Sequence, residues 1–577
     1  MKKQRTYLIG LLLLLLPYAL QAQVEKAVEV SKSYIPQVAT ATKPMIEPNL
    51  TDTVKIRPEI DYNILPRALN TSYTAQTFRP ATVTYWEFNR PSPYYLKLGM
   101  GYPLQSEADL YLSAQHGDIG YASLYLNHEG EYDKRRNDAD LKESALSMDN
   151  RIGVAAGRYL GRQILEGELY YDNRLRSRYG ASNPEEHYMV GERINFGEAG
   201  LSLRIGTDIE DEARVNLSIE GYGRYFYDNS GMPQPREYNQ MDGGGEGSIR
   251  FRWGKHRLGL RLNFNGVWGM GDLSHYNNLS YGGGLRYTFS TRLIEAEVGA
   301  DYLRTSIRSM ESKKSHNYIL PYAHLHFNLG EGAFVPFIEL DGEMRGSDFR
   351  SLSLENPYLK SGLALDKNWV DYHLRLGAMG EISSKFHYRL TLSLTCSENA
   401  HYWYGMNFPE QGDSNYLQFG VAQARRDQLS IGLNLGWRPT SGLLLSWETR
   451  ASHYKFSAWR GEHKLGGGLP ALTSTLKAEY ESRRIRIGAS ACVESVRNWS
   501  NLMFMAAPRN GGSEAIFEST IYHLPITIDL RCWFDCRISQ AVTLYVEGEN
   551  LTNSRLYEWA NYPLQGIGFM AGVRLTF

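Results

Sequence analysis

The sequence predicts an all-β protein: a transmembrane antiparallel β-barrel of about 22 strands, with short turns at one end and long loops at the other. Three observations predict this fold. The chain starts with an export signal, apolar and polar side chains alternate along residues 94–577, and the breaks between alternating segments are short and long in turn. We expect a signal peptide at 1–22, a separate segment at 23–93 and the barrel at 94–577.

The two regions before the barrel have different compositions. Residues 1–22 combine a basic start, an apolar run from about Leu8 to Leu16 and a small residue, Ala22, at the expected cleavage point, which is typical of an export signal. Residues 23–93 contain eight prolines. Because proline disrupts helices and central strands, we expect an extended segment that lies in the periplasm or threads into the lumen.

The final segment, GIGFMAGVRLTF at 566–577, shows the alternation well. Successive side chains of a strand point to opposite faces, so Phe569, Val573, Leu575 and Phe577 share one apolar face, and small or polar residues share the other. We expect this segment to close the barrel, with its apolar face against outer-membrane lipid. By analogy with other barrels, the terminal Phe577 is the predicted signal for the insertion machinery.

The breaks between strands alternate in length. Short ones, such as 117–120 and 254–256, take turns with long polar ones, such as 133–144, 347–370 and 498–520. Tight turns on one side and long loops on the other are typical of outer-membrane barrels, with the turns in the periplasm. A soluble β-propeller would show internal repeats, and the sequence has none that we could find.

Composition and motifs argue against several functional classes. A net charge of −1 does not suit a nucleic-acid binder, and four cysteines are too few for a disulfide scaffold. The common catalytic and phosphate-binding motifs are missing, so we expect no enzyme activity and no cofactor. His324 and His326 share a strand face without a third ligand fixed by the sequence, so we expect a polar lumen there and no metal site. Charged residues of both signs on the lumen face predict cross-strand ion pairs.

The C-terminal residues 545–577 resemble the end of TonB-dependent receptors. The matching motif residues are Asn550, Leu551, Thr552, Asn553, Tyr562, Pro563 and Gly566, followed by Gly572, Val573 and Phe577. Ile567 departs from the family, which has Arg after the loop glycine. The resemblance implies a 22-stranded barrel in the outer membrane of a Gram-negative bacterium, and it leaves the transported solute open.

The N-terminal side departs further from that family. Receptors of this type carry a folded plug domain inside the barrel, and residues 23–93 are too few to form one. The chain looks like a group of Bacteroidetes-type barrels that are receptor-like but lack the plug. The sequence leaves open whether a periplasmic energy-coupling protein engages it.

One long loop is more apolar than a solvated loop needs to be. Residues 498–520 include Trp499, Met503 and Phe504, so we expect this loop to occlude the lumen or to dock a partner, such as a surface lipoprotein. Two functions remain open. The first is uptake of an external solute, with any plug supplied by loops or a partner; the second is a non-conducting scaffold that docks periplasmic or surface lipoproteins.

Overall fold

The computed structural model describes residues 93–577, apart from 118, 139, 181–192, 208–213, 231–236, 311–312, 330–331, 408–417, 457–466 and 510–511. The side chains of 406–407 and 501–520 are also outside the description. The predicted signal peptide and nearly all of the proline-rich segment therefore lie outside the described residues, and both remain predictions.

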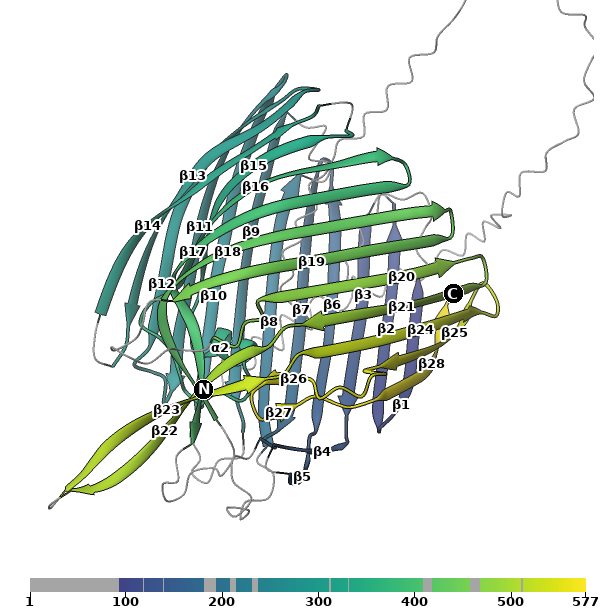
Figure 1. Ribbon diagram of the computed structural model, residues 1–577. Helices are drawn as coiled ribbons and strands as arrows, with labels where there is room; N and C mark the ends of the chain where they lie inside the picture. Colours follow the sequence, from purple (N-terminus) through teal and green to yellow (C-terminus); the bar gives the residue numbers. More distant parts are fainter. Residues whose placement is uncertain are drawn as a thin grey trace, which may run out of the picture. The chain divides into compact units, whose positions relative to one another are not determined.

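The wall of the barrel is a single antiparallel sheet that closes on itself (Figure 1). Its first eleven strands are β1 (Tyr94–Tyr102), β2 (Gln105–His116), β3 (Gly120–Glu131), β6 (Ser147–Leu160), β7 (Gln163–Ser177), β8 (Arg193–Thr207), β9 (Val215–Asp228), β10 (Tyr238–Trp253), β11 (His256–Gly271), β12 (Asn277–Ser290) and β13 (Ile294–Arg308). The other eleven are β14 (Lys313–Phe327), β15 (Val335–Arg345), β16 (Trp369–Ser383), β17 (Phe386–Asn407), β18 (Gln418–Thr440), β19 (Leu443–Phe456), β20 (Leu472–Glu481), β21 (Ile485–Glu494), β24 (Thr527–Arg537), β25 (Val542–Glu549) and β28 (Gly568–Thr576).

The large sheet has 24 strands, and all except β22 (Arg497–Arg509) and β23 (Gly512–Leu524) belong to the wall. The wall therefore has 22 strands, as the sequence predicts. It closes where β28 pairs with β1: Phe569 lies opposite Tyr102, Val573 opposite Leu98, and Leu575 opposite Leu96. Phe577 exchanges two backbone hydrogen bonds of 3.1 Å with Tyr94, so the last residue joins the first strand.

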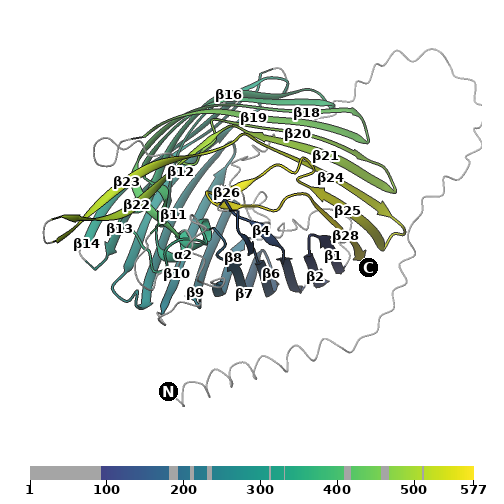
Figure 2. The ribbon, with the colours of Figure 1, turned by 60° about the horizontal axis from the view of Figure 1, so that its bottom comes forward.

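Most connections sort by end as expected; the exceptions are at the loop end, where β1 and β2 are joined by two residues and β13 and β14 by four. At what we call the turn end, links are as short as the two residues between β6 and β7, and β1 begins and β28 finishes there. At the opposite end, the loop end, connections contain elements of their own: β4 (Lys134–Arg136) and β5 (Lys142–Ser144), the helix α2 (Phe349–Glu355), and β26 (Tyr557–Trp559) with β27 (Tyr562–Pro563). Several of these elements lie within the outline of the barrel when the view is turned (Figure 2).

The predicted loop at 498–520 is largely a β-hairpin, β22–β23. This hairpin leaves the wall, because β21 pairs directly with β24. The start of β22 instead pairs in parallel with the end of β17, from Tyr404 opposite Ser500 to Asn407 opposite Met503. β17 and β18, with 22 and 23 residues, are also much longer than a membrane crossing needs, because their ladder continues past the wall toward the loop end.

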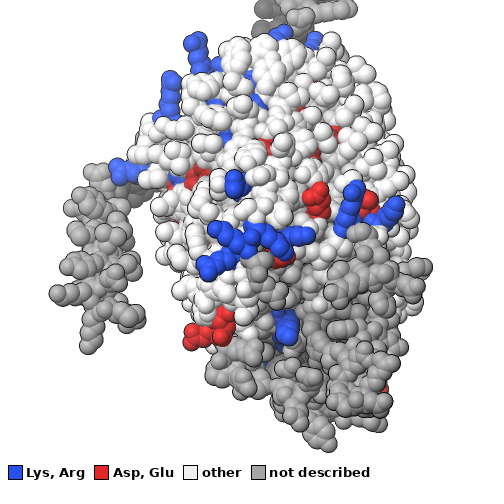
Figure 3. Space-filling view, turned by 90° about the vertical axis from the view of Figure 1, so that its left-hand side faces the viewer, with Lys and Arg blue, Asp and Glu red and all other residues white. Residues whose placement is uncertain are grey.

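The two faces of the wall differ as the alternation predicts. On β11, Leu258, Leu260, Leu262 and Phe264 are exposed on the outward face, whereas Arg261 points inward and pairs with Asp301 of β13. The side of the molecule in Figure 3 is mostly uncharged, with charged side chains confined to a few groups. An outward apolar face of this kind is suited to lipid. Among the described residues, no helix is long and apolar enough to cross a membrane.

Candidate functional site

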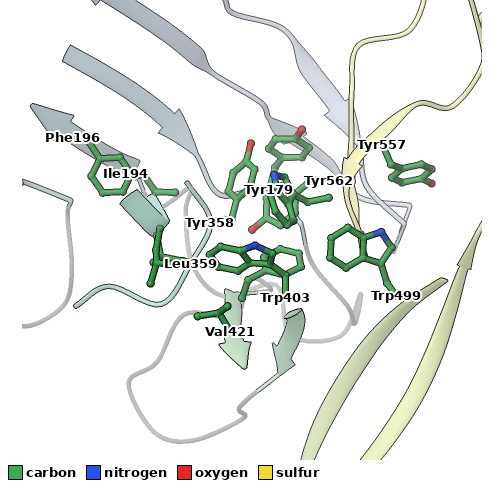
Figure 4. Close-up of a cluster of buried hydrophobic side chains, with 14 of the residues drawn as sticks. Tyr179, Ile194, Phe196, Tyr358, Leu359, Trp403, Val421, Trp499, Tyr557 and Tyr562 are labelled. Carbon is green, nitrogen blue, oxygen red and sulfur yellow. The ribbon is translucent and has the colours of Figure 1, made fainter. Parts of the chain in front are cut away.

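A cluster of buried, mainly aromatic side chains gathers at the loop end, and we call it the cap (Figure 4). Its members come from six connections and from the loop ends of the neighbouring strands. They are Ala145, Tyr179, Ile194, Phe196, Phe226, Leu273, Phe349, Leu352, Tyr358, Leu359, Trp403, Phe419, Val421, Trp499, Leu524, Tyr557, Trp559, Ala560 and Tyr562.

The cap joins wall strands that lie far apart around the barrel. On one side, Phe226 of β9 packs edge-on against Phe349 of α2, with ring centroids 5.8 Å apart. On the other side, Trp403 of β17 packs against Trp559 of β26 at 5.5 Å. Seven wall strands separate β9 from β17 in one direction around the barrel and thirteen in the other, so these contacts reach across the mouth of the barrel.

The two halves meet through one stacked pair of rings. Tyr358, just after α2, stacks on Tyr562 of β27 with centroids 3.7 Å apart and planes 19° from parallel. Tyr179, from the β7–β8 connection, packs edge-on against Tyr562 at 5.0 Å, and its hydroxyl donates to the Pro563 carbonyl at 3.0 Å. Buried aromatic pairs of this geometry contribute beyond their buried area. The middle of the cap is therefore built from three different loops.

Polar contacts anchor α2 to the wall. Asp348 caps the helix by accepting from the backbone N–H of Ser351 at 3.1 Å, and it also accepts from Gln240 Nε2 of β10 at 2.7 Å. Arg350 binds the Glu198 carboxylate of β8, with Nη2 3.0 Å from Oε1. These bonds orient the helix so that Phe349 and Leu352 are buried in the cap.

The C-terminal motif forms the loop that carries the other half of the cap. Asn550 and Asn553 adopt positive φ angles of 45° and 50°, a conformation that asparagine tolerates better than most residues. The Asn550 side chain accepts from the Ser554 N–H at 2.9 Å and donates to the Gln565 carbonyl at 3.0 Å, which holds both ends of the loop together.

The remaining motif residues also have structural positions. The Leu551 N–H donates to the Leu530 carbonyl at 2.8 Å, and the Thr552 hydroxyl donates to the Ile528 carbonyl at 2.5 Å, so both tie the loop to β24. Gly566 packs close to Asn553, because a Cβ there would lie 2.8 Å from Asn553 Oδ1. Tyr562 and Pro563 form β27 and enter the cap.

The apolar residues at 498–520 that we expect to occlude the lumen or dock a partner lie in two different places. Trp499 is 4% exposed and packs against Phe419 and Trp559, at centroid distances of 6.1 and 5.3 Å, so it belongs to the cap. Met503 and Phe504 lie further along β22, opposite Glu518 and Phe517 of β23. Their side chains are outside the described part of the chain.

The lumen wall carries cross-strand ion pairs of the expected kind. Asp301 pairs with Arg261 and Arg286 at 3.1 and 2.9 Å, and Arg574 of β28 binds Asp535 and Glu547 at 2.7 and 2.9 Å. These pairs keep buried charges compensated on a polar wall.

His324 and His326 face carboxylates across the β14–β15 ladder. His324 Nε2 lies 3.6 Å from Asp341, and His326 Nε2 lies 3.2 Å from Glu339. Within the described ranges, no group of three or more His, Cys, Asp or Glu side chains is placed to hold a metal ion.

Sequence reasoning did not single out α2 or its anchors. A helix start was visible in the long connection, because Asp348 directly precedes the segment FRSLSLE, and aspartate is a preferred N-cap. Its partners Gln240 and Glu198 lie more than a hundred residues away, so no local pattern could have identified them.

One carboxylate in the cap region should make cap stability depend on pH. The Glu355 side chain is 38% exposed; the protein around it would by itself raise its pKa, but hydrogen bonds from His401 Nδ1 at 2.9 Å and Trp403 Nε1 at 2.6 Å hold the pKa below its ordinary value. A depressed pKa gives stabilisation that is complete above the ordinary carboxylate pKa of about 4.3 and is lost as pH falls below it.

We therefore expect pepsin to cleave within 346–368 faster as the pH is lowered from 5 to 3, and Glu355→Gln to weaken this dependence. Asp140→Asn is the control, because the Asp140 carboxylate is exposed in another loop. Equal pH dependence in the wild type and Glu355→Gln would contradict the assignment.

Comparison with known proteins gives a consistent picture of the fold. No protein-family model and no curated protein sequence matches the chain significantly. Among solved structures, the iron transporter FrpB from Neisseria meningitidis (F5-1 variant) is similar, with a TM-score of 0.66 at 10% identity over 85% of this chain and 83% of FrpB. The fold is that of transporter barrels.

Two further structures support the same conclusion. The copper transporter OprC aligns with a TM-score of 0.63 at 14% identity, over 85% of this chain and 82% of OprC. The ferric yersiniabactin uptake receptor FyuA from Yersinia pestis aligns with a TM-score of 0.59 at 10% identity, over 85% of this chain and 81% of FyuA. At such low identity the similarity establishes the fold and leaves the solute undetermined.

Proposed function

We propose that the chain is an outer-membrane barrel of the TonB-dependent receptor-like type, that it takes up an external solute, and that its own loops close the lumen. The observation that carries this proposal is the cap, which joins loops from opposite sides of the mouth into one buried cluster. Barrels of about 16–18 strands already contain aqueous channels, so a 22-stranded wall needs something to obstruct it.

The remaining parts of the proposal rest on the sequence. The export signal and the C-terminal motif support insertion in the outer membrane with the loop end at the cell surface and Phe577 as the insertion signal. The short, proline-rich stretch before β1 supports the absence of a folded plug, as in the Bacteroidetes-type barrels that the chain resembles. The transporters of similar fold support uptake over catalysis.

Single-channel conductance in a planar bilayer tests this function. We expect the intact protein to carry little current, and a variant lacking residues 24–88 to remain equally silent, because the cap lies in the barrel loops. Large steady currents from the intact protein would contradict closure by the cap. Current only after the deletion would assign the obstruction to the N-terminal segment.

Outcomes with partners separate the two functions that the sequence leaves open. Stoichiometric copurification of a lipoprotein, together with silence under all conditions and no solute uptake in cells, would favour a scaffold. Growth dependence on a particular external solute would favour transport, and dependence on an energy-coupling protein would show active uptake.

A further inference from the structure

Two neighbouring wall strands, β14 and β15, are paired over only part of their length. β14 pairs with β13 along all of its 15 residues, but with β15 only from Tyr322 opposite Asp341 to His326 opposite Phe337. β15 continues toward the loop end, since it pairs with β16 as far as Arg345. Pro321, which has no backbone N–H to donate, is the first residue of β14 beyond the ladder.

On the loop-end side of Pro321, the β15–β16 pair overlaps the β13–β14 pair. Asp341 and Glu343 face the lumen, so Gly342 and Met344 point outward. Leu320 of β14, opposite Asp301, faces the lumen. A Cβ on Gly342 would nevertheless lie 3.0 Å from Leu320 Cβ, so an outward-facing position touches an inward-facing side chain. This is possible only if β15 passes on the lumen side of β14.

A small apolar cluster seals this overlap. It combines lumen-facing residues of β13 and β14 with residues of the loop-end parts of β15 and β16, namely Leu303, Tyr318, Leu320, Val370, Met344 and Tyr372. We call this arrangement the seam. The seam is closed by side-chain packing between β14 and β15. The neighbouring β13–β14 pair, in contrast, is held by backbone hydrogen bonds along its full length. Separating the seam therefore breaks no ladder hydrogen bond.

The seam lies level with residues of β13 and β14 that face outward, toward lipid. Ile319, next to Leu320 on β14, points outward and is 66% exposed, and Tyr302 of β13 lies directly opposite it on the same face. A large apolar residue beside an outward tyrosine is typical of the boundary between the apolar band and the aromatic girdle. The seam therefore opens toward the outer part of the apolar band.

A cavity of about 550 Å³ connects the seam with the lumen. Its apolar wall includes Leu303, Leu320 and Met344 from the seam. Its polar wall carries five carboxylates and two arginines: Glu220, Glu246, Asp301, Asp341, Glu343, Arg261 and Arg286. One cavity therefore offers an apolar end between strands and an end in the lumen that is rich in acceptors.

One carboxylate oxygen in this cavity lacks a partner. Asp301 is only 4% exposed, and its Oδ2 accepts from Arg261 and Arg286, but its Oδ1 has no hydrogen-bond partner among the described residues. A buried acceptor without a donor is costly. This oxygen lies against Gly284, so the attraction that the cavity offers a ligand comes from its five lining carboxylates, which favour a positively charged group with hydrogen-bond donors.

We propose that the seam is a lateral portal through which a single-chain amphiphile with a cationic head group passes between the outer leaflet and the lumen cavity. The alkyl chain lies between Leu320 and Met344, where it replaces the apolar contacts that seal the seam, and the head group lies beside Asp301. The proposal requires the barrel to lie in a membrane, and it is independent of solute passage through the cap.

Photo-crosslinking in phosphatidylcholine vesicles tests the portal. The probe is a dodecylammonium ion with a diazirine at the end of its chain, and the labelled peptides are mapped by mass spectrometry. We expect adducts to concentrate at 300–322, 339–345 and 370–372. The same chain with a sulfate head should label these peptides on the order of tenfold less, because the cavity is rich in carboxylates. Even labelling around the outward wall, or equal labelling by both probes, would overturn the proposal.

A disulfide across the seam provides a reversible lock. In a chain whose four native cysteines are replaced by serine, Leu320→Cys with Gly342→Cys places two cysteines side by side. Their Cβ positions are 3.0 Å apart, and a shift of roughly 0.5 Å between the strands reaches the Cβ–Cβ distance of a disulfide. Oxidation should lower labelling by the ammonium probe on the order of tenfold, since the chain loses its site between the strands, and reduction should restore it. Labelling that oxidation leaves unchanged, or failure of the disulfide to form in folded protein, would overturn the proposal.

The matched control is Thr305→Cys with His316→Cys, a directly opposed pair in the complete β13–β14 ladder, whose oxidation should leave labelling unchanged. Asp301→Asn gives an independent readout: it should reduce labelling by the ammonium probe and leave labelling by the sulfate probe equal or higher. None of these results depends on conductance, so failure of the portal and failure of cap-controlled uptake are distinguishable.

Discussion

Replacing Trp559 and Tyr562 with alanine is expected to turn a silent barrel into a conducting one. Trp559 packs against Trp403, Phe419 and Trp499 at centroid distances of 5.3 to 5.5 Å. Tyr562 stacks on Tyr358. The double substitution therefore removes the contacts of the C-terminal loop with the β17–β18 side and with the loop that follows α2.

The size of this effect follows from burial. Truncation of a buried large aromatic side chain costs about 3–5 kcal/mol, and 1.4 kcal/mol corresponds to a tenfold change in an equilibrium. Even partial loss of that energy should raise the fraction of open cap on the order of a hundredfold. Because the wall strands keep their ladders, we expect the barrel itself to remain folded.

Single-channel recording on folded protein in a planar bilayer measures this effect. Tyr132→Ala is the matched control, since Tyr132 is an aromatic residue at the loop end that is 38% exposed and lies outside the cap cluster. We expect current from the double variant and silence from Tyr132→Ala. A folded double variant that stays silent would show that the cap does not obstruct the lumen.

Replacing Glu339 with alanine is expected to give the largest loss of stability. Its side chain is 2% exposed and lies 3.3 Å from both Arg375 and Arg389 and 3.2 Å from His326. Removing one partner of a buried charge cluster leaves the others uncompensated, which costs roughly 3 kcal/mol. The cluster also joins β14, β15, β16 and β17, so the loss falls on four wall strands at once.

Urea unfolding in vesicles, followed by tryptophan fluorescence and by gel mobility, measures this loss as a lower midpoint. Glu343→Gln, on the same strand, is the control: its side chain is 53% exposed, and its pair with Arg345 should contribute about 0–1 kcal/mol. Equal midpoints for Glu339→Ala and the wild type would show that the cluster is not important for stability.

Much of the wall was predictable because strand periodicity is a local property. The alternation at 566–577 places Phe569, Val573 and Leu575 on one face from the sequence alone, and the paired register with β1 keeps them on one face. The order of short and long breaks likewise predicts which connections share an end, because each strand reverses the direction of the chain.

The cap and the seam were much harder to predict. Residues 498–520 read as a loop because their position between two wall strands required one, yet most of them form a hairpin outside the wall. The sequence pattern singled out Trp499 for its apolar character. It did not single out Tyr358, which lies in the same cap and comes from a different loop. Tyr358 and Tyr562 stack although 204 residues separate them, and no local pattern records that contact.

By itself, the sequence determined an all-β chain with a wall of about 22 strands, its two faces and its two ends, since each of these depends on near neighbours in the chain. Only the tertiary structure decided that loops from opposite sides meet in a cap, and that β14 and β15 overlap on the loop-end side of Pro321 in place of pairing. Those features depend on contacts between distant segments, whose energies are set by how the closed wall brings them together.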